Sequence, residues 1–170
     1  MNHQQQQQYA IEYFVKFLKM PVIESLEAQS IIQIEGEFKQ LLESLDIYGG
    51  FDWWVKFDKG IRGLASRIQW VEKSWDTWTI RKSKLSGNKT EYQKRTDAIA
   101  FEYLYPYYTL QAYITEDGGK LLSYAIAKTK DVISHIKEDQ VRGQSDGTKF
   151  YYVKWEDVKN DACWTIIEKI

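Results

Sequence analysis

An aspartate, an arginine and a glutamine lie close together in a stretch whose sequence predicts a β-hairpin. The turn is expected at Asp58-Lys59-Gly60, because glycine readily takes the positive φ that a tight hairpin turn needs. If Lys59 and Gly60 form a two-residue loop, Asp52 lies opposite Arg67, and a longer loop shifts this register by about one residue. Because side chains alternate along a strand, Arg67 and Gln69 share a face. The hairpin then presents an acid beside two polar side chains.

The chemistry of this group depends on what Asp52 contacts. The small residues Gly63 and Ala65 lie on the same face of the second strand as Arg67 and leave space in front of that face. A carboxylate beside such a space is suited to a divalent cation, which prefers oxygen ligands. The alternative is an ion pair between Asp52 and Arg67 across the strands, a common arrangement in antiparallel sheets. The sequence leaves both interpretations open.

A second carboxylate is expected on the helix that precedes the hairpin. Segment 22–45 has apolar residues at helical spacing, and on a helical wheel centred on Phe38 they form one stripe. Glu35 lies at the edge of this stripe and Glu37 on its flank, so Glu35 is the first candidate to approach Asp52. The alternative is that both glutamates lie on a solvated flank.

The most basic stretch of the chain runs from residue 81 to 95 and contains one acid, Glu91. A flexible loop at 86–88 is expected to lead into a helix over 91–103 that Thr90 caps. Lysine charges and the free N–H groups of a helix start both attract phosphate. The alternative is a solvated charged loop. The candidate nucleic-acid contacts here are Arg81, Lys82, Lys84, Lys89, Lys94 and Arg95.

Length and composition favour one domain that contains its own core. The chain has 170 residues, of which 44% are hydrophobic. The net charge of −1 means that any affinity for nucleic acid must come from a local basic patch. Cys163 is the single cysteine, so no internal disulfide forms, and the two histidines cannot complete a Cys–His zinc cluster with it.

The sequence also predicts a cytoplasmic protein without a membrane partner. No apolar run is long enough to cross a bilayer, and the first residues lack the basic-then-apolar order of a signal peptide. Residues 1–8 are polar and rich in glutamine, and are expected to be disordered. Residues 9–170 are expected to form a single α+β domain.

Periodicity predicts a mixed β-sheet flanked by helices. A first helix is expected over 9–20, and Pro21 is expected to break or restart the helix. After the hairpin, strands are expected at 77–83, 109–114, 121–127 and 150–155. Helices are expected at 91–103, at 129–136 and at 156–170, and residues 138–149 are expected to form a loop.

A helix followed by a hairpin that carries an acid and then a charged-x-polar element resembles the PD-(D/E)xK nuclease superfamily, over roughly Ile31 to Ile114. The resemblance implies a restriction-endonuclease-like core in which Asp52 and Glu35 hold Mg²⁺ or Mn²⁺. The chain departs from the family where Glu-x-Lys is expected. It has Arg67-Ile68-Gln69 there, and a guanidinium cannot bind a cation. Small tryptophan-rich chains of this kind also resemble proteins of phages and mobile elements.

Three functional hypotheses follow. The first is a metal-dependent nuclease in which Asp52 and Glu35 bind the metal, Gln69 orients water, and Lys82 or Lys84 supplies the missing cation. The second is a DNA- or RNA-binding domain without chemistry, in which Arg67 contacts a phosphate and the loop over 82–89 clamps the backbone. The third is a protein-interaction module, such as an inhibitor from a mobile element, that uses exposed aromatic anchors. The candidate anchors are Trp53, Trp75 and Tyr105.

Overall fold

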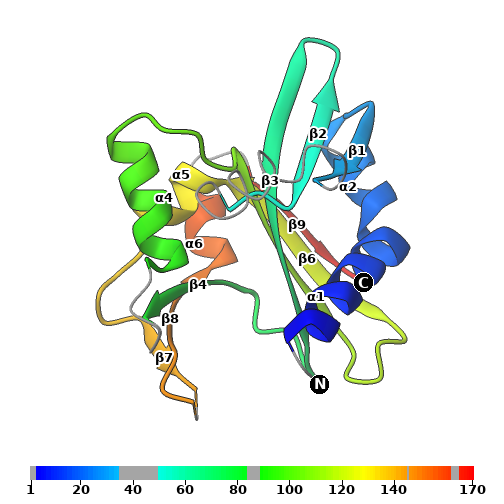
Figure 1. Cartoon of the computed structure of the whole chain (residues 1–170). Helices are drawn as coiled ribbons and strands as arrows, with labels where there is room; N and C mark the ends of the chain where they lie inside the picture. Colours follow the sequence, from blue (N-terminus) through cyan, green and yellow to red (C-terminus); the bar gives the residue numbers. More distant parts are fainter. Residues whose placement is uncertain (1–2, 35–49, 84–88, 145, 162–164) are drawn as a thin grey trace.

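The computed structural model describes residues 3–34, 50–83, 89–144, 146–161 and 165–170, and it has the predicted α+β architecture (Figure 1). The larger sheet is mixed and has six strands, in the order β1 (Ser30–Gln33), β2 (Trp53–Phe57), β3 (Gly60–Trp70), β5 (Tyr108–Ile114), β6 (Leu121–Lys128) and β9 (Thr165–Lys169). The smaller sheet has three strands, in the order β4 (Thr77–Ser83), β8 (Lys149–Lys154) and β7 (Val141–Gly143).

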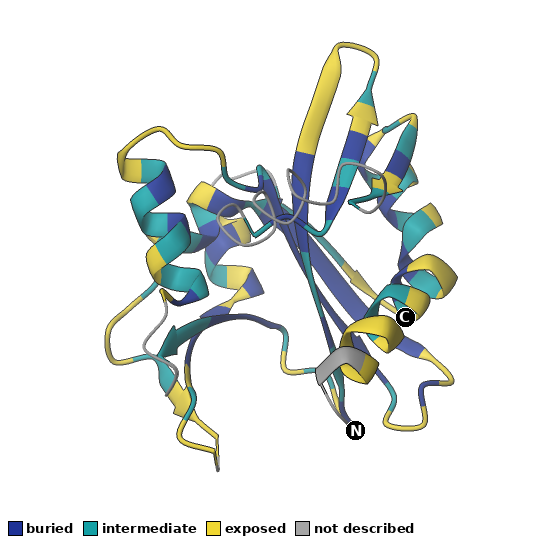
Figure 2. Cartoon of the chain, viewed as in Figure 1, coloured by how far each residue is buried: buried dark blue, intermediate teal, exposed yellow. Residues whose placement is uncertain are grey.

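The centre of the larger sheet is a parallel pair, β3 and β5, between antiparallel neighbours. Parallel strands cannot be joined by a tight turn, so the chain leaves β3, forms β4 and α4 (Glu91–Ala100), and returns along β5. The register of this pair places Arg67 level with Gln111. Figure 2 shows that the central strands are buried, whereas the tip of the β2–β3 hairpin is exposed.

The N-terminal helices cover one face of the larger sheet. They form a continuous run of α1 (His3–Tyr13), the π-helical turn η1 (Phe14–Leu18) and α2 (Lys19–Leu26). Phe14 stacks on Trp53 with a centroid separation of 4.1 Å, and both rings are buried. Large buried side chains from both layers make this the larger core, and they include Leu18, Val22, Leu64, Leu110 and Ile126.

The second face is covered by the smaller sheet and by two short helices, α5 (Thr129–Ser134) and α6 (Trp155–Asn160). Trp78 of β4 lies 6.1 Å from Trp155 of α6, and Trp155 lies 5.6 Å from Tyr113 of β5. Alternation along β5 directs Leu110 and Ala112 to the first core and Tyr113 to the second. These ring contacts fix the smaller sheet against the larger one near the end of β3 and the start of β4.

The structure corrects the predicted N-terminal elements. The helical run begins at His3, although residues 1–8 were predicted to be disordered, and it continues past Pro21, where the helix was predicted to break or restart. A π turn shifts the helical hydrogen bonds by one residue and leaves one carbonyl without an N–H partner. Because η1 directly precedes the proline-containing turn, the missing N–H of Pro21 is tolerated there.

The predicted helix over 22–45 is confirmed over 22–26, within α2, and is wrong for the described residues that follow. Glu27 has a left-handed φ of 51° and ends α2, and residues 30–33 form β1. The β-branched Ile31 pairs with Val55 of β2 and is buried, so sheet pairing overrides the helical spacing. Residues 35–49, which include Glu35 and Glu37, lie outside the described residues.

The predicted C-terminal helix over 156–170 is confirmed over 156–160 and is wrong over 165–169. Helix α6 ends at Asn160, and residues 165–169 form strand β9 against β6. Thr165, Ile166 and Ile167 are β-branched and fit an edge strand better than a helix. The predicted loop over 138–149 contains the short strand β7.

Several local predictions are confirmed. Strand β4 covers the predicted residues 77–83, and the strands predicted at 109–114, 121–127 and 150–155 are present within one residue at their ends. Thr90 caps α4, with a reciprocal bond from its N–H to the Gln93 side chain. Within the described residues, no helix is both long and apolar enough to cross a membrane.

Candidate anion-binding site

The turn of the β2–β3 hairpin lies one residue earlier than predicted, and this changes the pairing of the two strands. The turn residues are Asp58 and Lys59, so Phe57 pairs with Gly60 and Trp53 with Leu64. Asp52 therefore lies beside Ser66, and its Oδ2 accepts hydrogen bonds from the Ser66 N–H at 2.5 Å and from the Ser66 Oγ at 3.2 Å. The predicted register with Asp52 opposite Arg67 is wrong. The space expected at Gly63 is filled by the ring of Phe51.

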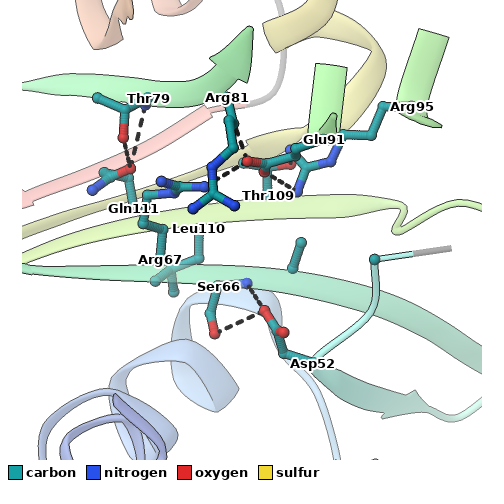
Figure 3. Close-up of a pocket in the computed structure, with 12 residues that line it drawn as sticks. Asp52, Ser66, Arg67, Thr79, Arg81, Glu91, Arg95, Thr109, Leu110 and Gln111 are labelled. Carbon is teal, nitrogen blue, oxygen red and sulfur yellow. Dashed lines mark hydrogen bonds and ion pairs between the residues drawn. The ribbon is translucent and has the colours of Figure 1, made fainter. Parts of the chain in front are cut away.

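Arg67 instead forms an ion pair with Glu91 at the start of α4. The distance from Arg67 Nη2 to Glu91 Oε2 is 2.5 Å. Arg95, one helical turn further along α4, binds the other carboxylate oxygen at 2.7 Å. The backbone N–H of Arg81 also donates to Oε2, at 3.3 Å. Figure 3 shows Arg67, Arg81 and Glu91 close together, and one carboxylate thus connects β3, β4 and α4.

The ionisation of Glu91 follows from these contacts. Burial opposes the charged form, but the positive charges of Arg95 and Arg67 and the Arg81 N–H outweigh it and lower the pKa of Glu91 to about 2. The Glu91 side chain is 23% exposed. It is therefore a carboxylate at neutral pH, and it holds the guanidinium groups of Arg67 and Arg95 in fixed positions.

Arg81 has unused hydrogen-bonding capacity. Its Nε is buried and has no hydrogen-bond partner among the described residues. Its guanidinium lies 5.7 Å from the ring centroid of Phe150, and that of Arg67 lies 5.3 Å from the same ring. Two cations thus share one aromatic neighbour, which offsets part of their mutual repulsion. Two adjacent guanidinium groups are a suitable arrangement for a phosphate or carboxylate ligand.

Two buried polar side chains form the floor of the site. Gln111 is 1% exposed, and its Oε1 accepts hydrogen bonds from the N–H and the hydroxyl of Thr79. Its Nε2 donates to Gln69 Oε1 at 2.9 Å. Arg95 is 5% exposed and its Nη1 lies 3.4 Å from Thr109 Oγ1, while its Nε has no hydrogen-bond partner among the described residues. The floor is therefore polar and fixed by β4 and β5.

These residues enclose a cavity of about 270 Å³ that we call the arginine pocket. Its charged lining consists of Arg67, Arg81, Arg95, Glu91 and Asp52. Three guanidinium groups thus face two carboxylates, and the formal balance is positive. Figure 3 shows Asp52 and Ser66 at one border of the cavity and Thr79 and Gln111 at another.

A larger cavity of about 920 Å³, which we call the aromatic groove, adjoins the arginine pocket. The two cavities share Ser66, Arg67 and Arg81. The groove is lined by residues of α1, β3, β4 and β8 and of the β3–β4 and β5–β6 connections. Its aromatic lining consists of Tyr9, Tyr13, Trp70, Trp75 and Phe150.

The lysines of the predicted basic stretch are placed differently from its arginines. Lys82 pairs with Glu138 at 2.9 Å, and Lys89 pairs with Asp97 at 2.6 Å. Lys94 lies on α4 and is partly buried, and Lys84 lies outside the described residues. Of the six basic residues in that stretch, Arg81 and Arg95 line the arginine pocket.

The described residues fit a divalent cation poorly. Among them, no group of three or more His, Cys, Asp or Glu side chains is arranged to hold a metal ion. Glu91 is already engaged by two arginines, and a third guanidinium lines the same cavity. Asp52 is the one predicted ligand that is described, since Glu35 is not. A Mg²⁺ or Mn²⁺ site at Asp52 and Glu35 stays a prediction.

No protein-family model matches the chain, and neither a curated protein nor a solved structure matches it.

Sequence reasoning missed four residues of the site. Glu91 was counted only as an acid within a basic stretch, although its spacing to Arg95 is that of a helical ion pair. Ser66, Gln111 and Phe150 carried no local signal. The prediction of Trp53 as an exposed protein-interaction anchor is wrong, because its side chain is 3% exposed. Of the other two predicted anchors, Trp75 is 47% exposed and Tyr105 is partly buried.

Proposed function

We propose that this chain binds nucleic acid and that the arginine pocket takes a backbone phosphate. The observation that carries the proposal is the pair Arg67 and Arg81, which lies at the border of the two cavities. The Nε of Arg81 there is buried and has no hydrogen-bond partner in the part of the chain that the structure describes. A planar guanidinium can donate two parallel hydrogen bonds to phosphate oxygens, so two such groups side by side are suited to this ligand.

Glu91 supports this function by positioning the arginines. Its ion pairs limit the rotamers of Arg67 and Arg95 before a ligand arrives, which lowers the entropy cost of binding. Because Glu91 neutralises only part of the charge, the pocket stays positive. Since the whole chain has a net charge of −1, the affinity is expected to depend on this local site rather than on a general polycation.

Binding of labelled oligonucleotides, measured by fluorescence anisotropy over a range of salt concentrations, tests the proposal. The variant Arg81→Gln should weaken binding roughly 5- to 150-fold and reduce the salt slope by about one. The matched control is Arg62→Gln, because Arg62 is an exposed arginine 4.0 Å from the Tyr107 ring and does not line either cavity. No binding at low salt, or equal affinities of both variants, would contradict the proposal.

Phosphodiester hydrolysis is a second candidate, because Asp52 lines the same cavity as Arg67 and Arg81. A carboxylate beside a bound phosphate is the arrangement from which hydrolysis would start. Single- and double-stranded substrates incubated with Mg²⁺, Mn²⁺ or EDTA test this activity. Cleavage that Asp52→Asn abolishes would support it, and binding without cleavage under every condition would leave the binding function alone.

A further inference from the structure

We propose that the nucleic acid is single-stranded, with its bases against the rings of the aromatic groove and a phosphate in the arginine pocket. This inference rests on the proposed phosphate-binding function and adds the class of ligand. Its basis is the continuity of the two cavities, since Arg67 and Arg81 line both. A ligand that places a phosphate between these arginines has its adjacent sugar and base at the entrance of the groove.

The rings of the groove are accessible. Tyr9 is 44% exposed and Trp75 is 47% exposed, although large aromatic side chains are usually mostly covered. They come from different elements: Tyr9 belongs to α1, and Trp75 to the connection between β3 and β4. Base-to-ring stacking is tolerant of sequence, because every base presents an aromatic face.

Neighbouring side chains hold these rings in place. Tyr9 lies 6.4 Å from Tyr13, which meets Trp70 edge-on at 5.7 Å. Trp75 lies 6.0 Å from the buried ring of Tyr113, and the Arg142 guanidinium lies 5.5 Å from it. Fixed rings lose little conformational entropy when a base stacks on them.

Polar side chains in the groove suit the edges of bases. Amide groups can both donate and accept hydrogen bonds, as the Watson–Crick edge of an unpaired base requires. The groove is lined by four glutamines, Gln6, Gln7, Gln69 and Gln144. Glu116 and Asp117 also line it, so acceptors, rather than a continuous basic track, lie beyond the arginines.

This charge distribution argues against a duplex. A duplex covers the faces of its bases by stacking and presents two phosphate backbones. The faces of its stacked bases could not contact the rings of Tyr9 or Trp75. Its phosphate backbones would approach the carboxylates of Glu116 and Asp117. A single strand can place one phosphate at the arginines and direct unstacked bases toward the rings.

The experiment compares three probes of equal length: an oligonucleotide single strand, the duplex of the same sequence, and an abasic single strand that has phosphates without bases. The native chain should bind the single strand roughly 5- to 150-fold more tightly than the other two. Tyr9→Ala and Trp75→Ala should remove that preference and leave abasic binding unchanged. Tyr103→Ala is the matched control, because Tyr103 is 65% exposed and lies outside the groove.

The outcomes separate this inference from the function on which it rests. If single strand and duplex bind equally and Arg81→Gln weakens both, the ligand class is wrong and phosphate binding stands. If a mononucleotide binds as tightly as the oligonucleotide, the assignment of a single strand as the ligand is also wrong. If no probe binds, both proposals fail. Since Tyr9 is a surface residue of α1, its variant tests stacking even if Trp75→Ala disturbs the fold.

Discussion

The Arg67 guanidinium of β3 donates to the Glu91 carboxylate of α4 at 2.5 Å, across 24 residues of sequence. Glu91 receives Arg95 on its other oxygen, so the ion pair is part of a three-residue network. This network connects the larger sheet to the crossover that returns the chain to it. Its removal should therefore affect both stability and ligand binding.

The variant Glu91→Gln should lower the free energy of unfolding in a pH-dependent manner. The pKa of Glu91 is lowered from 4.5 to about 2, so its contribution of about 3 kcal/mol is fully present above about pH 4.5 and is lost as the pH falls toward 2. Urea unfolding of both proteins at pH 7, 4 and 2.5 measures this. Glu72→Gln, which changes an exposed glutamate, is the control. A stability difference that does not shrink with acidification would refute the assignment.

Gly63→Ala should destabilise the hairpin. A Cβ at this position would overlap the ring of Phe51, which is 1% exposed and stacks on Trp54 at 5.2 Å. Overpacking of this kind costs about 1–3 kcal/mol, which corresponds to a fall in Tm of roughly 2–12 °C. Thermal unfolding is compared with that of Gly143→Ala, where nothing lies within 4 Å of the added Cβ. An equal Tm for both variants would contradict this account of Gly63.

Asp52→Ala should cost stability whether or not Asp52 takes part in chemistry. The substitution removes the acceptor of the part-buried Ser66 N–H, and a hydrogen bond to a charged group contributes about 1.5–3 kcal/mol. Asp52→Asn keeps an accepting oxygen and should cost less. Chemical denaturation of the two variants measures the difference. If they are equally stable, the hydrogen bond to Ser66 does not account for the role of Asp52 in the fold.

Neutralising the exposed lysines should affect nucleic-acid binding less than neutralising Arg81. Lys82 and Lys89 already pair with Glu138 and Asp97, and removing either lysine frees an acid. Such surface pairs contribute little individually. We expect Lys82→Ala and Lys89→Ala to change affinity by less than roughly threefold, measured by anisotropy at constant salt. If either lysine variant loses more affinity than Arg81→Gln, the binding site lies at the predicted basic loop and not at the arginine pocket.

Features with local causes were predictable from the sequence. The capping box at Thr90 involves residues three positions apart, and in strand β4 β-branched and aromatic residues alternate with polar ones. Both were predicted correctly. The α+β class followed from the number and order of such segments.

Features that depend on distant partners were not predictable in the same way. Residues 30–33 have helical spacing, but β2 offers a pairing edge that only the folded chain presents. The hairpin register moved with a one-residue change of turn, and this was enough to replace Arg67 by Ser66 beside Asp52. Arg67 lines the arginine pocket, but its pairing with Glu91 depends on the path of the crossover.

The parallel pairing of β3 with β5 has a consequence for the kinetics of folding. The residues that face each other in this pair, such as Arg67 and Gln111, are far apart in sequence, and closing so long a loop is slow. The hairpins β2–β3 and β5–β6 close shorter loops and can form earlier. We therefore expect the arginine pocket to be assembled late in folding, after the local hairpin contacts. An anion bound there should slow unfolding and leave the refolding rate nearly unchanged.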